Sequence, residues 1–332
     1  MRSIKTIVSP VLAGLLAVSL ASCSSTPVPE VSPGATYDGP ALTEERFTTA
    51  LKDAEKVLAE GDAAKDGEKL GARFVGDALA ARTAAYTLAT KTDGAKAPTP
   101  LSFTPQVTLP AITDSFPRHA AVITQVPEGQ TSPVLLTMTQ ADARQNYRVD
   151  HWARLFPGVT FPDLPAAATG TEFLAPDDSS LKQTPSAAVA AYARAINEPD
   201  SEEAKSLGND PLRTQITETV TALTESLAEV GEASWKAGSP TSEPVAFRTA
   251  DGGAVVVGTI PTVLTLKKTV ARSTLTVSDD LAALAGEDPV EDQLKASYQV
   301  MIALYVPAAD AADAATRPLG GEQTLMSAKR GE

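Results

Sequence analysis

The stretch that decides the fold is Leu294–Val306, LKASYQVMIALYV. Its even-numbered residues are all apolar or aromatic, whereas the odd-numbered ones include Lys295 and Gln299. Because successive side chains of a β-strand point to opposite faces, this alternation predicts a long strand whose even-numbered face lies in a core. We expect Ile302→Asp to be strongly destabilising and Gln299→Asp to cost little.

The segment 211–230 is predicted to be the helix that covers this strand. Asp210-Pro211 is typical of a helix start, and an apolar stripe with steps of three or four follows it and needs a partner surface. Other elements predicted in this half are a helix begun by Thr184-Pro185 and strands over Val245–Thr249, Ala254–Lys268, Thr274–Val277 and Gln323–Ala328.

The first half of the chain repeats this order, with helices before strands. Thr43 is a good N-cap for a helix that Gly61 ends, and an Ala-rich segment over 62–92 predicts a second helix. A Pro-rich connection follows over 98–110, and then come strands over Ala120–Val126, Val134–Met138 and Tyr147–Phe156.

Helices followed by antiparallel strands, twice, predict an α+β fold with two tandem domains. No periodicity is sustained between Pro165 and Thr184, so we interpret that region as a linker. The predicted parts are a signal peptide (1–22), a lipidated flexible tether (23–40), a first α+β domain (41–165), the linker (166–183) and a second α+β domain (184–332).

The N-terminus has the features of a bacterial export signal. Arg2 and Lys5 precede an apolar run over Ile7–Ala21, which is shorter than the about 20 residues of a membrane-spanning helix. The sequence LASC at 20–23 resembles the lipobox of bacterial lipoproteins. This resemblance implies cleavage before Cys23, lipid on its thiol and a body held at the extracytoplasmic face of the cell membrane.

The layout also resembles the cone-shaped fold of nuclear transport factor 2 and its cystatin-like relatives, in which a curved sheet wraps a long helix. Residue by residue, the chain is similar to an uncharacterised family of actinobacterial secreted lipoproteins. The similarity lies in the lipobox, the run YRVDHWARLFPG at 147–158 with Pro162 after it, and the helix that begins at Thr184-Pro185. These motifs are structural, so the resemblance transfers no catalytic residue.

Composition and motifs narrow the classes of function. The 332 residues carry a formal net charge of −13, and because an acidic body repels phosphate backbones we expect no nucleic-acid partner. His119 and His151 have no metal-ligand spacing, and the sequence contains no nucleophile elbow, P-loop or dinucleotide fingerprint. We therefore predict no metal and no cofactor, and we favour a protein that is not an enzyme.

One cluster could form a binding face, namely Arg144, Tyr147, Arg148 and Trp152 in an otherwise acidic chain with few aromatic residues. Arginine, tyrosine and tryptophan are the residue types that most often anchor ligands and partners. The other interpretation is packing, in which the aromatic rings close the sheet and the arginines pair with surplus carboxylates.

These observations favour a non-enzymatic binding or scaffolding module of the cell envelope, with an envelope protein or a cell-wall component as partner. The alternative is a small-ligand-binding protein or an enzyme that uses the pocket of a cone-shaped domain. A cavity with converging polar groups would support the alternative. A broad exposed apolar patch would support a partner-binding module.

Overall fold

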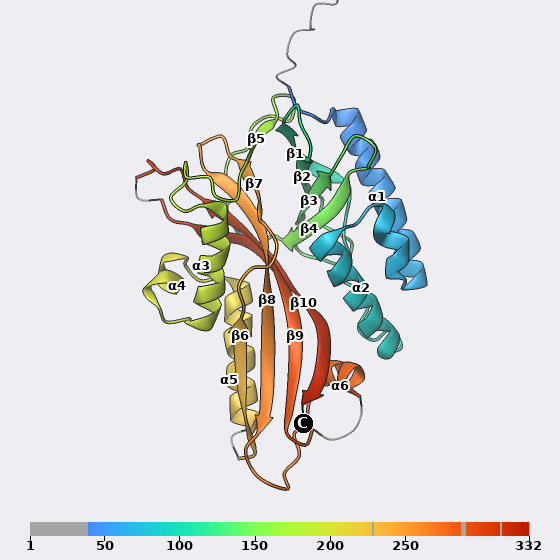
Figure 1. The fold of residues 1–332 in the computed structure, drawn as a ribbon, viewed down its shortest axis with the longest axis vertical. Coiled ribbons are helices and arrows are strands. Elements are labelled where there is room, and N and C mark those ends of the chain that lie inside the picture. The colour runs from blue at the N-terminus through green and yellow to red at the C-terminus, as the bar shows by residue number, and fades with distance from the viewer. Residues whose placement is uncertain (1–38, 228, 287–289, 313, 332) are drawn as a thin grey trace, which may run out of the picture. The chain divides into compact units, whose positions relative to one another are not determined.

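A computed structural model describes residues 39–227, 229–286, 290–312 and 314–331, which belong to one compact unit (Figure 1). The predicted signal peptide, Cys23 and most of the tether lie outside the described residues. Within these ranges, no helix has both the length and the apolar character needed to cross a bilayer.

Helices and strands alternate irregularly along the chain. The helices are α1 (Glu44–Ala64), the 3-10 helix η1 (Gly67–Ala72), α2 (Gly76–Lys91), α3 (Pro185–Asn197), α4 (Glu202–Ser206), α5 (Pro211–Leu227) and α6 (Asp279–Ala285). The strands are β1 (Pro105–Ile112), β2 (Arg118–Thr124), β3 (Val134–Gln140), β4 (Arg148–Arg154), β5 (Thr171–Leu174), β6 (Gly231–Ala237), β7 (Val245–Arg248), β8 (Ala254–Lys268), β9 (Gln293–Val306) and β10 (Arg317–Gly331).

The strands of both halves belong to one sheet. Its order is β10-β9-β8-β7-β5-β1-β2-β3-β4, with β6 paired to β8. All pairs are antiparallel except β1 with β5. A bridge between Leu155, just after β4, and Gly320 in β10 brings the two ends of this order together, so the sheet is nearly closed and barrel-like. The predicted α+β class is confirmed, but the structure shows one joined sheet instead of two tandem cones.

The predicted linker is not a structureless connection. Residues 166–183 contain β5, which pairs with β1 on one side and β7 on the other and so joins the two halves of the sheet. This strand has only four residues, too few to show a hydrophobic period. Separate folding of residues 41–165 and 184–332 stays a prediction.

The helix starts marked by threonine N-caps were predicted accurately, because they depend on local chemistry. The Oγ1 atoms of Thr43 and Thr184 accept hydrogen bonds from the backbone N–H groups of Arg46 and Ala187. The helix predicted over 62–92 is instead η1 followed by α2, and α1 continues past Gly61 to Ala64. Besides β5, three strands were missed or misplaced. β1 lies partly in the predicted Pro-rich connection, β6 holds Trp235, and the predicted strand 274–277 is reduced to a single bridge between Leu275 and Val290.

The decisive strand, β9, is buried on both faces from Gln299 to its end. Its even-numbered residues lie in one core together with Leu212 of α5, as predicted. Its odd-numbered face is covered by the first half of the chain: Met301 belongs to the core under α1 and α2, and Tyr305 belongs to a third core with β1 to β4. The expectation that Gln299 tolerates charge is therefore wrong. Gln299 is only 8% exposed, and its Nε2 donates to the backbone oxygen of Asp77 at 3.0 Å.

We predict that Ile302→Asp and Gln299→Asp each destabilise the protein by several kcal/mol, since each buries a carboxylate and Gln299→Asp also removes the hydrogen bond to the backbone oxygen of Asp77. Urea unfolding followed by circular dichroism measures the effect. The matched control is Lys295→Gln, because Lys295 is exposed on the same strand and should change stability by no more than about 0.5 kcal/mol. A small effect of Gln299→Asp would contradict the burial of the odd-numbered face.

Candidate functional site

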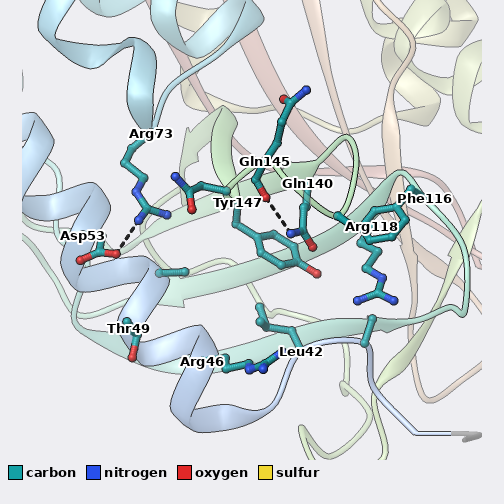
Figure 2. A pocket seen from close by; sticks show the side chains of 14 residues that line it. Leu42, Arg46, Thr49, Asp53, Arg73, Phe116, Arg118, Gln140, Gln145 and Tyr147 are labelled. Carbon is teal, nitrogen blue, oxygen red and sulfur yellow. Dashed lines mark hydrogen bonds and ion pairs between the residues drawn. The ribbon is translucent and has the colours of Figure 1, made fainter.

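A cavity of about 390 Å³ opens between the start of α1, the end of η1, the start of β2 and the loop before β4 (Figure 2). Its volume falls within the range of about 300–1,000 Å³ that is usual for small-ligand sites. The wall is largely polar and includes three arginines, Arg46, Arg73 and Arg118. We call this cavity the arginine pocket.

The three guanidinium groups face only one carboxylate in the wall, that of Asp53. Arg73 is held in place by this carboxylate, with Nη2 at 2.5 Å from Oδ2 of Asp53. Arg46 is exposed on the first turns of α1, and it makes no ion pair with any described residue. The pocket is thus cationic, although the chain as a whole carries a net charge of −13.

Arg118 and Tyr147 form the inner part of the pocket. The guanidinium of Arg118 stacks over the ring of Phe116, 4.3 Å from its centroid, while its Nε is buried without a hydrogen bond. The hydroxyl of Tyr147 is likewise buried and without a hydrogen-bond partner. Burial raises the pKa of Tyr147, and the charge of Arg118 opposes that shift only in part. The phenol therefore stays protonated and is available as a donor.

The loop before β4 is shaped by Asp142. Its carboxylate accepts hydrogen bonds from the backbone N–H groups of Arg144 and Gln145, a short-range pattern that favours turns. The backbone oxygen of Gln145 then accepts from Nε2 of Gln140, at 2.7 Å. These bonds place the loop at the mouth of the pocket, next to Tyr147 (Figure 2).

The residues predicted as a binding face do not come together. Tyr147 lines the arginine pocket, and Arg148 is half-buried and donates to Oε1 of Gln145. Arg144 is exposed on the loop and is not part of the wall. Trp152 is 3% exposed and lies in the core under α1 and α2, with its indole at a different cavity. Tyr147 and Trp152 lie on the same face, because the register of β4 shifts between Val149 and His151 and both side chains belong to the core under α1 and α2. They line different cavities because they lie at opposite ends of β4.

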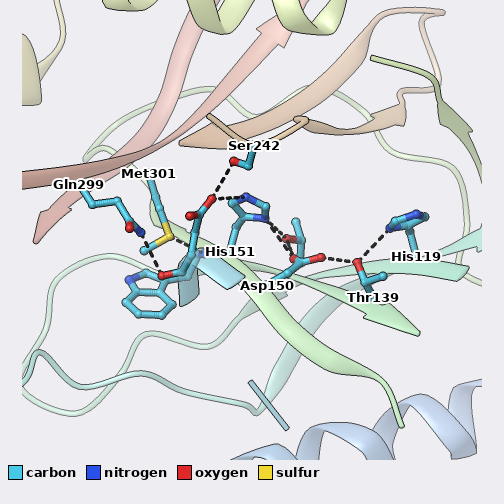
Figure 3. Close-up of polar contacts among 10 residues, drawn as sticks. His119, Thr139, Asp150, His151, Ser242, Gln299 and Met301 are labelled. Carbon is cyan, nitrogen blue, oxygen red and sulfur yellow. Dashed lines mark hydrogen bonds and ion pairs between the residues drawn. The ribbon is translucent and has the colours of Figure 1, made fainter. Parts of the chain in front are cut away.

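A second polar feature is a buried chain of hydrogen bonds and ion pairs around His151 (Figure 3). Nδ1 of His151 lies 3.2 Å from Oδ1 of Asp150, and Nε2 lies 3.4 Å from Oδ2 of Asp77, at the start of α2. Asp150 also accepts hydrogen bonds from the hydroxyls of Thr137 and Thr139. Ser242, in the loop before β7, donates to Asp77 at 2.8 Å. We call this the histidine cluster.

The charged residues of the histidine cluster all belong to the first half of the chain, and Ser242 of the second half joins them through a hydrogen bond. Burial alone would lower the pKa of His151, but its contacts with Asp150 and Asp77 outweigh burial and raise it to about 9. The pKa values of both aspartates are lowered, because bonds to His151 offset their burial. At neutral pH the cluster is therefore one imidazolium between two carboxylates. Among the described residues, no group of three or more His, Cys, Asp or Glu side chains is arranged to hold a metal ion.

The fold and the pocket together define an α+β protein with a nearly closed sheet and a cationic cavity of small-ligand size. Its family is shown by the sequence: residues 38–330 match the model of a domain of unknown function (DUF8094), and the chain belongs to this family. The expectation of an uncharacterised family is confirmed at this level. No curated protein and no solved structure matches the chain.

We predict that stability falls between about pH 6.5 and pH 9 through His151. The folded state holds its proton up to pH 9, whereas the unfolded chain releases it near pH 6.5, so the contribution is complete below pH 6.5 and is lost as the pH rises through 9. The shift corresponds to up to about 3 kcal/mol. Urea unfolding at several pH values measures it. His151→Gln should remove this pH dependence, and the same loss in the variant as in the parent would contradict the assignment.

Proposed function

We propose that this protein is a lipid-anchored, extracytoplasmic binding protein that holds an anionic group of a cell-envelope component in the arginine pocket. The observation that carries the proposal is the convergence of Arg118, Tyr147 and Arg46 on one cavity that contains a single carboxylate. Guanidinium groups bind phosphate and carboxylate groups through paired N–H donors. The proposed role needs no chemical step.

The exposed surface also supports recognition by a pocket. In the described ranges, the exposed large apolar side chains are Ile112, Val126 and Val270, on three separate segments. Broad partner interfaces are usually built around a contiguous apolar or aromatic centre. An anionic ligand in a cationic cavity instead gains from charge and from donors fixed before binding.

The proposed location rests on the N-terminal sequence, with its basic start, short apolar run and LASC at residues 20–23. Ala41 and Leu42, which directly follow the proposed tether, line the arginine pocket. The tether would therefore lead into the body at the pocket. Phosphate groups of membrane lipids and of cell-wall polymers both fit the chemistry of the pocket.

We predict that inorganic phosphate binds the full chain at low ionic strength and that Arg118→Ala weakens binding about tenfold or more, because a charge-assisted hydrogen bond is lost. Isothermal titration calorimetry measures the affinity. The matched control is Arg194→Ala, since Arg194 is an exposed arginine on α3 that pairs with Glu203. Equal affinities of Arg118→Ala and the parent would contradict an anion site here.

The source of the phosphate group can be separated in a second experiment. Vesicles of phosphatidylglycerol should compete with inorganic phosphate if the ligand is a lipid headgroup, whereas vesicles of phosphatidylcholine should not. Competition by a soluble poly(glycerol phosphate), without competition by either vesicle, would indicate a wall polymer.

We also predict that Cys23→Ser releases the protein from the membrane and blocks its processing, since the thiol is the expected site of lipid attachment. Membrane fractionation and intact mass measure both effects. A Cys23→Ser variant that stays bound and is cut at the same peptide bond would contradict the lipoprotein assignment. Phosphate binding is measured separately, so one half of the proposal can fail without the other.

A further inference from the structure

A second, separate cleft lies at the seam where the sheet nearly closes. One cavity of about 410 Å³ lies between the end of β4 and the start of α5, and another of about 190 Å³ lies between α2 and β10. The two cavities share the wall residues Thr99, Glu322 and Gln323, so they adjoin. We call them together the seam cleft.

The walls of the seam cleft hold polar atoms that the fold leaves unused. Nε1 of Trp152, Nη1 of Arg154 and Oε1 of Gln323 are buried without a hydrogen-bond partner. Oε2 of Glu322 is also buried and makes no hydrogen bond, although it lies 3.4 Å from Nη2 of Arg154 in an ion pair. Each such group costs about 1–3 kcal/mol when it is left unpaired. Two of them are donors and two are acceptors. Their concentration in one cleft indicates that a ligand or ordered water satisfies them.

Charge in the cleft is largely balanced. Nη2 of Arg154 lies 3.4 Å from Oε2 of Glu322, and the side chains of both residues keep 17% exposure. Burial raises the pKa of Glu322, although the charges of Arg154 and Arg82 oppose that shift. Arg82 itself is committed to Asp62, with its Nη2 at 2.6 Å from Oδ2. A fully charged ligand would meet one partner of the Arg154–Glu322 pair with the same sign of charge.

We propose that the seam cleft binds a neutral carbohydrate. A sugar hydroxyl donates and accepts at once. The cleft offers both roles: Trp152 is a donor in the smaller cavity, Arg154 is a donor in the larger one, and the acceptors of Glu322 and Gln323 line both. The hydroxyl of Ser132 and the ring of Phe156 complete the larger cavity. Apolar walls of this kind pack against the C–H faces of a sugar ring, while a few convergent polar groups orient it.

This site is independent of the arginine pocket. None of its wall residues lines that pocket, and its polar groups come from α2, the loop after α2, β4 and β10. Trp152, one of the residues singled out in the sequence, lies here and not beside Tyr147. The seam cleft therefore gives that tryptophan a role that packing alone leaves unexplained, since its indole N–H has no partner.

The test uses the two tryptophans of the chain. In a proton–nitrogen correlation spectrum of the full chain they give two indole N–H resonances, and Trp235→Phe assigns them. Maltotriose, cellotriose and chitotriose are added separately, each to about 10 mM, which detects even weak binding. At least one of them should shift the Trp152 resonance and leave that of Trp235 in place.

Variants then locate the binding groups. Glu322→Gln and Gln323→Ala should each weaken the binding of the active sugar about fivefold or more, through lost hydrogen bonds. Glu232→Gln is the matched control, because Glu232 lies on β6 in a surface pair with Lys267. The Trp235 resonance and the thermal midpoint show that each variant is folded. If Glu322→Gln does not fold, the affinity of Gln323→Ala for the sugar alone tests the proposal.

Three results would overturn the proposal. The first is the absence of a Trp152 shift with every sugar, which would leave ordered water as the partner of the unused groups. The second is unchanged affinity in Gln323→Ala. The third is a Trp152 shift with the tripeptide Ala-Ala-Ala and with none of the sugars, which would identify the cleft as a peptide site.

Discussion

The structure depends on the burial of β8 and β9 between two layers of apolar side chains. One face of β9 lies in the core with α3 and α5, and the other face meets the cores of the first half through Met301 and Tyr305. Burying apolar surface contributes about 25 cal/mol per Å², so a strand covered on both faces brings together more core than one with a solvated face. The two halves are therefore joined by packing as well as by the pairing of β5.

Burial on both faces also encloses polar and charged groups, which are costly to remove from water. In the histidine cluster this cost is offset by ion pairs and hydrogen bonds. The backbone oxygen and the carboxylate of Asp77 lie at the joint between α2 and the long strands, where Gln299 and His151 satisfy them. An isolated carboxylate in such a place would be costly, whereas one that is paired and hydrogen-bonded is tolerated. The seam cleft is the opposite case, because several of its buried polar atoms make no hydrogen bond within the protein.

The elements that the sequence predicts correctly are those set by local chemistry, such as helix starts, and those with a long hydrophobic periodicity. Thr43 and Thr184 mark helix starts through their side-chain hydroxyls, and β9 is long enough for its alternation to be unambiguous. β5 could not be predicted, because four residues carry no period and its pairing partners are distant in sequence. Gln299 was misjudged for the same kind of reason: a polar residue on the second face of a strand indicates solvent unless another part of the chain covers it.

Prediction of the candidate sites from the sequence has the same limit, because their residues come together only in the fold. Tyr147 was singled out from its neighbours in sequence, but Arg46, Arg73 and Arg118 lie on three different elements and share no motif. Only the fold brings them to one cavity. His151 was considered in the sequence as a histidine without metal-ligand spacing, and its partner Asp77 belongs to a distant helix and had no signal in the sequence.

The bridge between Leu155 and Gly320 has a consequence for the order of folding. A side chain at Gly320 would place its Cβ 2.7 Å from the Cα of Leu155, so the two backbones approach closely. This contact joins segments that are far apart along the chain. Closing so long a loop lowers the conformational entropy of the chain, and this cost is offset only by the contacts that form at the seam. The seam therefore cannot close until synthesis has passed residue 320. A chain released early would expose the unpaired edge of β9, the kind of edge through which proteins aggregate.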